Sequence, residues 1–283
     1  MRNLERQIAL FGKAGQQRIN ETAVTVVGVG GLGTHVVQQL AFLGVKNFTL
    51  IDPEELDNNN LNRYVGARID DPIPGTLKVD IAERLICSIE RQPKIQKLPV
   101  KLQTRDALEA ITAADMVFGC VDKESLRFIL NHFCVAFAKR LLDCGTGVDG
   151  EGASLRYGGQ VFVMWEPPGC MVCCGNLDMQ EVREELAGEA DRKNRAAVYG
   201  VDRSLTAETG PSVISINGLI ASAAITEFMV GITGLRKPNR AFKYWAHTGK
   251  TSLGVPLPSP DCYTCSLWGK RWNAQPQQYF EPM

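Results

Sequence analysis

Two kinds of hydrophobic pattern alternate through the first half of the chain. Apolar side chains recur every three or four positions, as on one face of a helix, in residues 3–20, 32–43, 76–90, 105–112 and 125–139. Patterns typical of strands lie between these stretches, at residues 24–27, 48–51, 97–102, 115–122 and 140–144. Strands and helices that alternate in this way predict an α/β fold, a doubly wound Rossmann-like sheet whose first half is parallel.

The pattern changes after residue 144. Residues 158–165 predict a strand that no crossover helix follows, and a further strand is expected at 242–246, so we expect added antiparallel strands. Residues 180–198 are rich in charge and predict an exposed helix and loop within a crossover segment, 175–208. Residues 237–283 predict a carboxy-terminal extension. With no internal repeat or linker, we expect one domain over residues 1–283.

One apolar run, Val213–Val230, approaches the length of a membrane span. It contains Asn217 and Glu227 and many small residues, which favours a helix buried in the fold or at a subunit interface. We therefore expect no membrane association.

A glycine cluster follows the first strand, in the sequence V-V-G-V-G-G-L-G, and consists of Gly28, Gly30, Gly31 and Gly33. Glycines at a strand-to-helix turn allow a tight turn, close approach of the backbone to phosphate, and close helix packing. Asp52 ends the second strand, where a carboxylate can bind ribose hydroxyls. This unit predicts a nucleotide or dinucleotide site, with a purely structural turn as the alternative, and it does not distinguish a dehydrogenase from a nucleotidyltransferase.

Composition narrows the choice of partners. Hydrophobic residues make up 45% and charged residues 22% of the 283 residues, as in soluble globular proteins. The formal net charge is zero, so electrostatics do not favour a nucleic acid or a membrane surface. The amino-terminal residues have no basic flank followed by an apolar core, which predicts a cytoplasmic protein.

Two C-x-x-C pairs, Cys170/Cys173 and Cys262/Cys265, account for four of the nine cysteines. Two such pairs can supply the four thiolates of a tetrahedral zinc site, which would tie the extension to the body of the protein. The alternative, redox-active pairs, requires a pair at the start of a helix, and the sequence suggests this at neither position. Cys174 is left over beside the first pair.

Taken together, these motifs resemble those of a known family. Arg6-Gln7, the glycine loop, Asp52, N-L-N-R ending at Arg63, Lys78, C-V-D ending at Asp122 and the two C-x-x-C pairs occur in order. The chain resembles the ThiF/MoeB/HesA adenylyltransferases, bacterial relatives of ubiquitin-activating enzymes, from about residue 5 to 265.

The resemblance implies an enzyme that binds Mg-ATP and adenylates the carboxy-terminal glycine of a ubiquitin-like or sulfur-carrier protein, releasing pyrophosphate. It implies that Asp52 binds the ribose, that Asn60 and Arg63 contact ATP, that Lys78 neutralises the phosphates and that Asp122 holds Mg²⁺. Without the resemblance, Arg63 and Lys78 could be ordinary surface charges and Asn60 a turn residue.

The resemblance also implies a homodimer, because the family arginine at the position of Arg6 reaches into the partner's ATP site. It further suggests a conjugating-enzyme or sulfurtransferase partner. The chain departs from the family pattern at Tyr64, where glutamine is usual, and at Lys123, where asparagine is usual.

A third departure concerns the cysteine that many members carry in the crossover segment. Thr206–Gly210 occupies that place here, and no cysteine lies between Cys174 and Cys262. We expect the reaction to stop at the acyl-adenylate, with Cys174 the only nearby thioester candidate.

Two other functions remain open on the sequence. An NAD-dependent oxidoreductase would use the same glycine loop, but dinucleotide binding does not require Arg63, Lys78 and Asp122. A non-enzymatic, zinc-stapled scaffold could retain the nucleotide fold without its chemistry.

Overall fold

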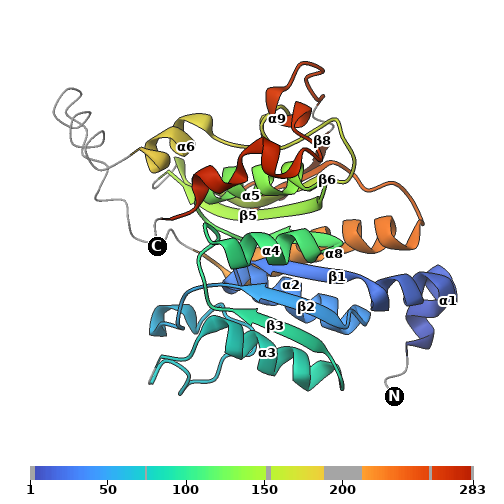
Figure 1. The fold of residues 1–283 in the computed structure, drawn as a ribbon. Helices are drawn as coiled ribbons and strands as arrows, with labels where there is room; N and C mark the ends of the chain where they lie inside the picture. Colours follow the sequence, from blue (N-terminus) through green and yellow to red (C-terminus); the bar gives the residue numbers. More distant parts are fainter. Residues whose placement is uncertain (1–3, 74, 151–153, 188–211, 255–256, 282–283) are drawn as a thin grey trace.

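A single mixed sheet organises the structure. The computed structural model describes residues 4–73, 75–150, 154–187, 212–254 and 257–281. Within these residues eight strands pair in the order β3-β2-β1-β4-β5-β6-β7-β8 (Figure 1). The strands are β1 (Ala23–Val27), β2 (Asn47–Ile51), β3 (Lys94–Leu98), β4 (Met116–Gly119), β5 (Arg140–Asp149), β6 (Arg156–Met164), β7 (Ala241–Trp245) and β8 (Lys250–Gly254).

The two halves of the sheet differ in direction. Strands β3, β2, β1, β4 and β5 pair in parallel, whereas β5, β6, β7 and β8 pair antiparallel. The predicted fold class is therefore confirmed. Strand β8 was not predicted, and three predicted strands have wrong bounds. The strand expected at 97–102 lies at Lys94–Leu98, the one expected at 115–122 ends at Gly119, and the one expected at 140–144 continues to Asp149.

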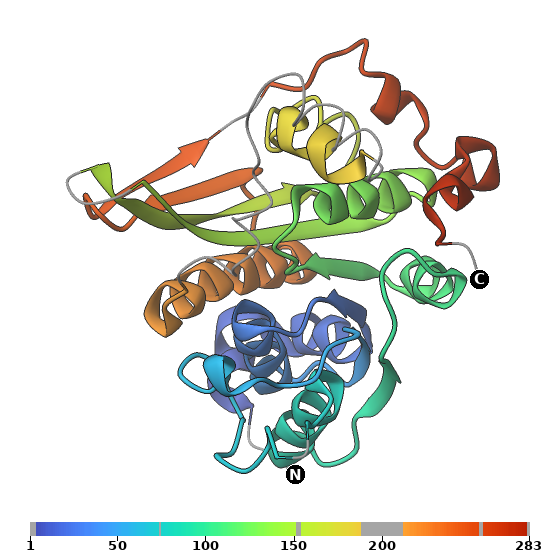
Figure 2. The ribbon, with the colours of Figure 1, turned by 90° about the vertical axis from the view of Figure 1, so that its left-hand side faces the viewer.

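Helices cover both faces of the sheet (Figure 2). They are α1 (Glu5–Glu21), α2 (Gly31–Leu43), α3 (Lys78–Ile89), α4 (Arg105–Ala113), α5 (Glu124–Ala136), α6 (Met179–Leu186), α8 (Ile214–Thr233) and α9 (Tyr263–Ser266). One buried cluster joins α1, α2, α3 and α8 to the sheet, and a second joins α4, α5 and the carboxy-terminal segment. Helix α6 confirms the start of the predicted exposed helix; residues 188–198 and Thr206–Gly210 lie outside the described residues.

Helix α8 is the one described helix that is long and apolar enough to cross a membrane by length and composition. Its buried side chains, including Ile220 and Phe228, pack against α2 and the sheet, so its hydrophobicity is explained by the core. The buried Glu227 carboxylate pairs with Arg236 at 2.7 Å and accepts the backbone N–H of Asn239. The helix is therefore a core helix, as its small and polar residues predicted.

The segment 257–281 lies against α5. His132 of α5 accepts the hydroxyl hydrogen of Tyr279 through Nδ1 and donates from Nε2 to the carbonyl of Ala274, each at 3.0 Å. We assign this tautomer because a carbonyl can only accept. An ion pair between Lys101 and Glu281 adds a contact near the end of the segment.

Candidate nucleotide site and metal centre

The glycine loop lies at the carboxyl ends of β1 and β4, where the strand order reverses. Open α/β sheets bind ligands at this point. Gly28 has a φ of +85°, and a Cβ there would lie 2.6 Å from the carbonyl oxygen of Cys120. A Cβ on Gly33 would lie 2.1 Å from the carbonyl oxygen of Gly28. Local backbone contacts therefore require glycine at both positions.

Asp52 faces the glycine loop from the end of β2. One carboxylate oxygen accepts the N–H of Val29 at 2.8 Å and the other accepts the N–H of Glu54 at 2.9 Å. Burial raises the pKa of Asp52, and nearby Lys78 and the two N–H donors partly offset that rise. Two backbone hydrogen bonds thus fix the orientation of this carboxylate beside the loop.

Lys78 is the first residue of α3, and its side chain is buried beside the same turn. Its ammonium group forms an ion pair with Glu54, and its backbone N–H donates to the Glu54 carbonyl at 2.9 Å. The buried hydroxyl of Tyr64 donates to the Lys78 carbonyl at 3.0 Å. Tyr64, at the position where glutamine is usual, therefore has a structural role: it anchors the loop that contains Arg63 against the start of α3.

Arg63 lies against the glycine loop at Gly31. Its Cγ would be 3.1 Å from a Cβ on Gly31, and its guanidinium donates to the carbonyl of Asn59 at 2.6 Å. Asn60 closes a capping box, in which its side-chain oxygen accepts the N–H of Asp57 at 3.3 Å. This bond supports the interpretation of Asn60 as a turn residue and engages only its carbonyl oxygen.

The buried side chain of Asn217 also lies at the glycine loop. From the sequence, Asn217 was only a polar residue within an apolar run. Its Nδ2 would lie 3.0 Å from a Cβ on Gly31. Its Oδ1 accepts the hydroxyl hydrogen of Thr146 at 2.9 Å. The first turn of α8, β5 and the glycine loop therefore meet at this side chain.

Asp122 is exposed, three residues after the end of β4. Cys120 donates its N–H to the carbonyl of Val27 at 2.8 Å, which keeps this strand end against the glycine loop. Arg6, in contrast, is exposed at the start of α1. Its neighbour Gln7 donates to the Phe42 carbonyl near the far end of α2, so the structure does not bring Arg6 to the glycine loop of its own chain.

A buried ion cluster that the sequence analysis missed lies behind Asp122. Arg127 of α5 forms ion pairs with Asp143 of β5 and Glu124 of its own helix. Burial lowers the pKa of Arg127, but these two carboxylates outweigh burial and raise it above its ordinary value. Glu124 also accepts the N–H of Asp178 at 2.9 Å, which ties α5 to the start of α6.

The four cysteines of the two C-x-x-C pairs come together, as predicted. Sulfur–sulfur distances are 3.9 Å for Cys170–Cys173, 3.9 Å for Cys170–Cys262 and 3.7 Å for Cys173–Cys265, and all four sulfurs lie within 4.8 Å of one another. Four sulfurs around a tetrahedral zinc ion, each at a Zn–S distance of about 2.3 Å, lie about 3.8 Å from one another. The cluster therefore fits zinc and is too open for a disulfide.

One detail of this cluster corrects the sequence analysis. The sequence suggested the start of a helix at neither pair, but the second pair lies at the start of the short helix α9, where Cys262 is the N-cap and its sulfur accepts the N–H of Cys265 at 3.5 Å. Beside the first pair, burial raises the pKa of the Cys174 thiol to about 11, although Arg240 donates to its sulfur at 4.0 Å.

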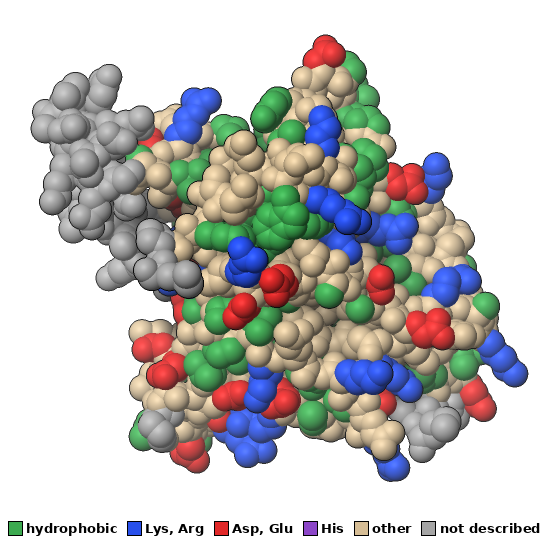
Figure 3. Space-filling model, in the orientation of Figure 1, with side chains coloured by type: hydrophobic (Ala, Val, Ile, Leu, Met, Phe, Trp, Pro, Cys, Tyr) green, Lys and Arg blue, Asp and Glu red, His purple; other side chains and the backbone are tan. Residues whose placement is uncertain are grey.

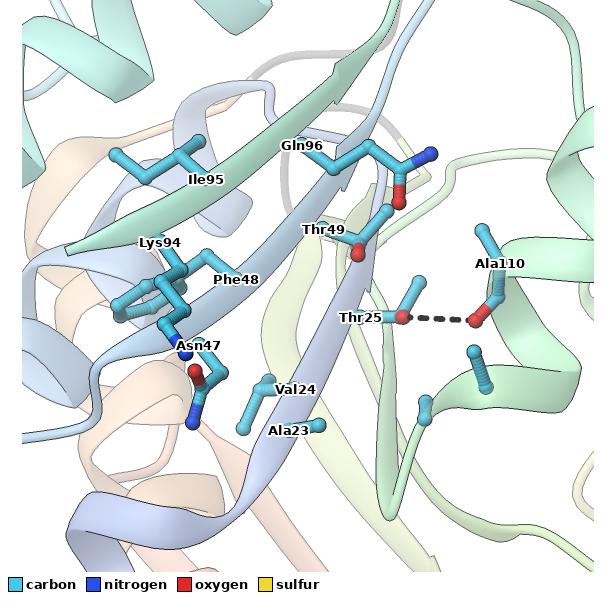
Figure 4. A pocket seen from close by; sticks show the side chains of 12 residues that line it. Ala23, Val24, Thr25, Asn47, Phe48, Thr49, Lys94, Ile95, Gln96 and Ala110 are labelled. Carbon is cyan, nitrogen blue, oxygen red and sulfur yellow. Dashed lines mark hydrogen bonds between the residues drawn. The ribbon is translucent and has the colours of Figure 1, made fainter.

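A groove of about 300 Å³ lies elsewhere, across the face of β1, β2 and β3 beside α4 (Figure 4). Thr25 and Thr49 pair in register and line it together with Gln96. It extends to Ala23 and Asn47 at the amino ends of their strands. It is therefore separate from the glycine loop.

On the face shown in Figure 3, Lys and Arg side chains are interspersed with Asp and Glu side chains. This mixture agrees with the zero net charge. On this face it differs from the continuous basic surface that binds a nucleic-acid backbone.

The parallel half-sheet, the glycine loop at its switch point and the acidic and basic residues around it define a doubly wound α/β protein with the geometry of a nucleotide site. Residues 4–264 match the ThiF family, and the chain belongs to that family.

Two curated relatives and one solved structure illustrate the likeness. The chain is 30% identical over 183 residues to "Adenylyltransferase and sulfurtransferase MOCS3" of Drosophila virilis, covering 60% of this chain and 39% of that protein. It is 30% identical over 156 residues to "Sulfur carrier protein adenylyltransferase" of Thermus thermophilus, covering 55% of this chain and 54% of that protein. The chain thus spans about half or less of these relatives.

The fold is shared with a crystal structure of E. coli MccB with ATP. The TM-score is 0.72 at 18% identity, over 93% of this chain and 75% of that one.

Proposed function

We propose that this protein uses ATP to adenylate the carboxy-terminal glycine of a ubiquitin-like or sulfur-carrier protein, releasing pyrophosphate. The observation that carries the proposal is the convergence of Asp52, Arg63 and Lys78 on a glycine loop at the switch point, with Asp122 three residues after the adjoining strand β4. Membership of the ThiF family and the names of the relatives, an adenylyltransferase and sulfurtransferase and a sulfur carrier protein adenylyltransferase, support it.

In the proposed reaction, a carboxylate oxygen of the terminal glycine forms a bond to the α-phosphorus of ATP. The bond from that phosphorus to the bridging oxygen breaks, and pyrophosphate leaves. Because two anions must approach each other, the site needs positioned cations and hydrogen-bond donors more than it needs an acid or base. The substrate carboxylate is itself the nucleophile.

Each residue has a distinct proposed role. The backbone at Gly28, Gly30, Gly31 and Gly33 admits the phosphates, and the dipole of α2 favours their charge. Asp52 binds the ribose, Asn60 and Arg63 contact ATP, with Arg63 on phosphate, and Lys78 neutralises the phosphates as charge develops. Asp122 would hold Mg²⁺, because an exposed carboxylate at this strand end offers the oxygen ligands that the ion prefers. Bound Mg²⁺ supplies further charge neutralisation.

We propose that Cys170, Cys173, Cys262 and Cys265 hold a structural Zn²⁺. The ion would join two segments that are far apart in the chain, in one domain spanning residues 1–283. Cysteines bind zinc as thiolates, so zinc binding would release protons.

We propose that the reaction stops at the acyl-adenylate. No cysteine lies between Cys174 and Cys262, and Cys174 directly follows Cys173 of the proposed zinc cluster, so we do not expect it to form a thioester. Delivery to sulfur or to an amine would then depend on a sulfurtransferase or conjugating-enzyme partner.

We also propose a cytoplasmic homodimer in which Arg6 enters the ATP site of the partner subunit. The placement of Arg6 away from its own glycine loop supports this arrangement.

ATP–pyrophosphate exchange with candidate carrier proteins tests the function. Carrier-dependent exchange is expected, and Asp122→Ala should abolish it while the thermal unfolding curve stays unchanged. Tight NAD binding without exchange would instead indicate the oxidoreductase. Nucleotide binding without turnover by any carrier would indicate a zinc-stapled scaffold.

A further inference from the structure

A short antiparallel bridge places Glu54 and Lys78 side by side. Leu56 donates its N–H to the Thr76 carbonyl at 2.8 Å, and Lys78 donates its N–H to the Glu54 carbonyl at 2.9 Å. The turn before the bridge is fixed because the N–H of Glu54 donates to Asp52. The backbone thus presents a carboxylate and an ammonium group, 24 residues apart in the chain, at the same point of the site.

The two partners of this ion pair differ in burial. The Lys78 side chain is 9% exposed, whereas the Glu54 side chain is 67% exposed. A buried ammonium group without a partner is costly, so Lys78 needs an anion at all times. Glu54 can turn into water at little cost, because most of its side chain is already hydrated.

We infer that Glu54 is a displaceable counter-ion that occupies Lys78 until a phosphate group replaces it. The inference rests on the proposed function, in which Lys78 binds the phosphates of ATP. Glu54 would hold the ammonium group in place before the nucleotide binds. It would also compete with phosphate for Lys78, because one ammonium group cannot pair fully with both anions. Glu54 is therefore a positioning residue that limits phosphate affinity.

The test measures calorimetric binding of inorganic tripolyphosphate and of Mg-ATP to the full chain and to Glu54→Gln. Glu54→Gln removes both the competing ion pair and the repulsion between Glu54 and the incoming phosphates, so the variant should bind both ligands about two- to tenfold more tightly. A merely structural role for Glu54 would predict weaker binding. The gain should shrink at high salt.

Glu55→Gln is the matched control, because it removes the same charge one residue away. The Glu55 side chain lies over Gly75, where its carboxylate oxygen would be 2.0 Å from an added Cβ. This variant should bind tripolyphosphate like the wild type. In a Lys78→Met background, Glu54→Gln should bring no gain, because the group for which the anions compete is absent.

The outcomes separate this inference from the proposed function. The exchange of anions is overturned if Glu54→Gln binds both ligands no more tightly than the wild type, or if Glu55→Gln gains as much affinity as Glu54→Gln. In either case the proposed adenylation still stands, provided that the wild type binds Mg-ATP. Failure of the wild type to bind Mg-ATP, with tripolyphosphate binding still tightened by Glu54→Gln, overturns adenylation and supports the exchange. Absence of any binding in all variants overturns both.

Discussion

Gly33→Ala tests whether helix α2 is held against the glycine loop as the structure describes. The new Cβ would lie 2.1 Å from the carbonyl oxygen of Gly28, so α2 must shift by about 1 Å to restore an ordinary contact. Overpacking of this kind costs about 1–3 kcal/mol or more, and a backbone oxygen cannot rotate away. The higher helix propensity of alanine returns about 1 kcal/mol. Because the backbone oxygen cannot move aside, we take the upper end of that range, so the net loss is about 2 kcal/mol, which lowers Tm by about 4 °C.

Gly30→Ala is the matched control, because a Cβ there meets nothing within 4 Å. Gly30 is the N-cap of α2, where alanine is less favourable than glycine by no more than about 1 kcal/mol. The assay compares thermal unfolding and Mg-ATP binding for both variants. Gly30→Ala should keep Tm within about 2 °C, because its Cβ would enter open space. Equal Tm values for wild type and Gly33→Ala would refute the close packing.

Three further predictions address charge, metal and pH. Asp122→Asn should lower exchange at least tenfold without changing Tm, and unchanged exchange would remove Asp122 from the site. Cys265→Ser should lower bound zinc from about one ion per chain to near zero and reduce Tm by several degrees, whereas Cys87→Ser, at an exposed thiol outside the cluster, should do neither. Burial lowers the pKa of His132 below its ordinary 6.5, so this residue stabilises the fold above pH 6.5 and loses that contribution as pH falls. The Tm should therefore drop between pH 7 and 5.5, and an equal drop in His132→Gln would exclude His132 as the cause.

Local patterns predicted much of the fold and part of the site. The glycine loop and Asp52 follow directly from a strand, a turn and a helix that are continuous in sequence. The two C-x-x-C pairs were also recognisable, because two intervening residues suffice to bring both sulfurs to one ion. These features depend on short-range geometry, which the sequence expresses directly.

Other features depend on tertiary contacts that no local pattern reports. The Glu54–Lys78 pair joins two segments only through the backbone bridge, although an acid two residues after Asp52 was a usable signal. The buried pair of Arg127 and Asp143 was missed because charged residues are expected at the surface. Strand β8 has the sequence K-T-S-L-G, with one large apolar side chain. It was missed because it lies at the edge of the sheet, where few side chains are buried and no alternation of apolar and polar residues is required.

The central claim is that this protein transfers AMP to a terminal carboxylate. The most direct measurement is mass spectrometry of a glycine-terminated ubiquitin-like or sulfur-carrier protein after incubation with the full chain and Mg-ATP. We expect a carrier species heavier by one adenylate, which is sensitive to hydroxylamine and is absent with Asp122→Ala. An unmodified carrier across a panel of such proteins, with the protein folded and nucleotide bound, would contradict it.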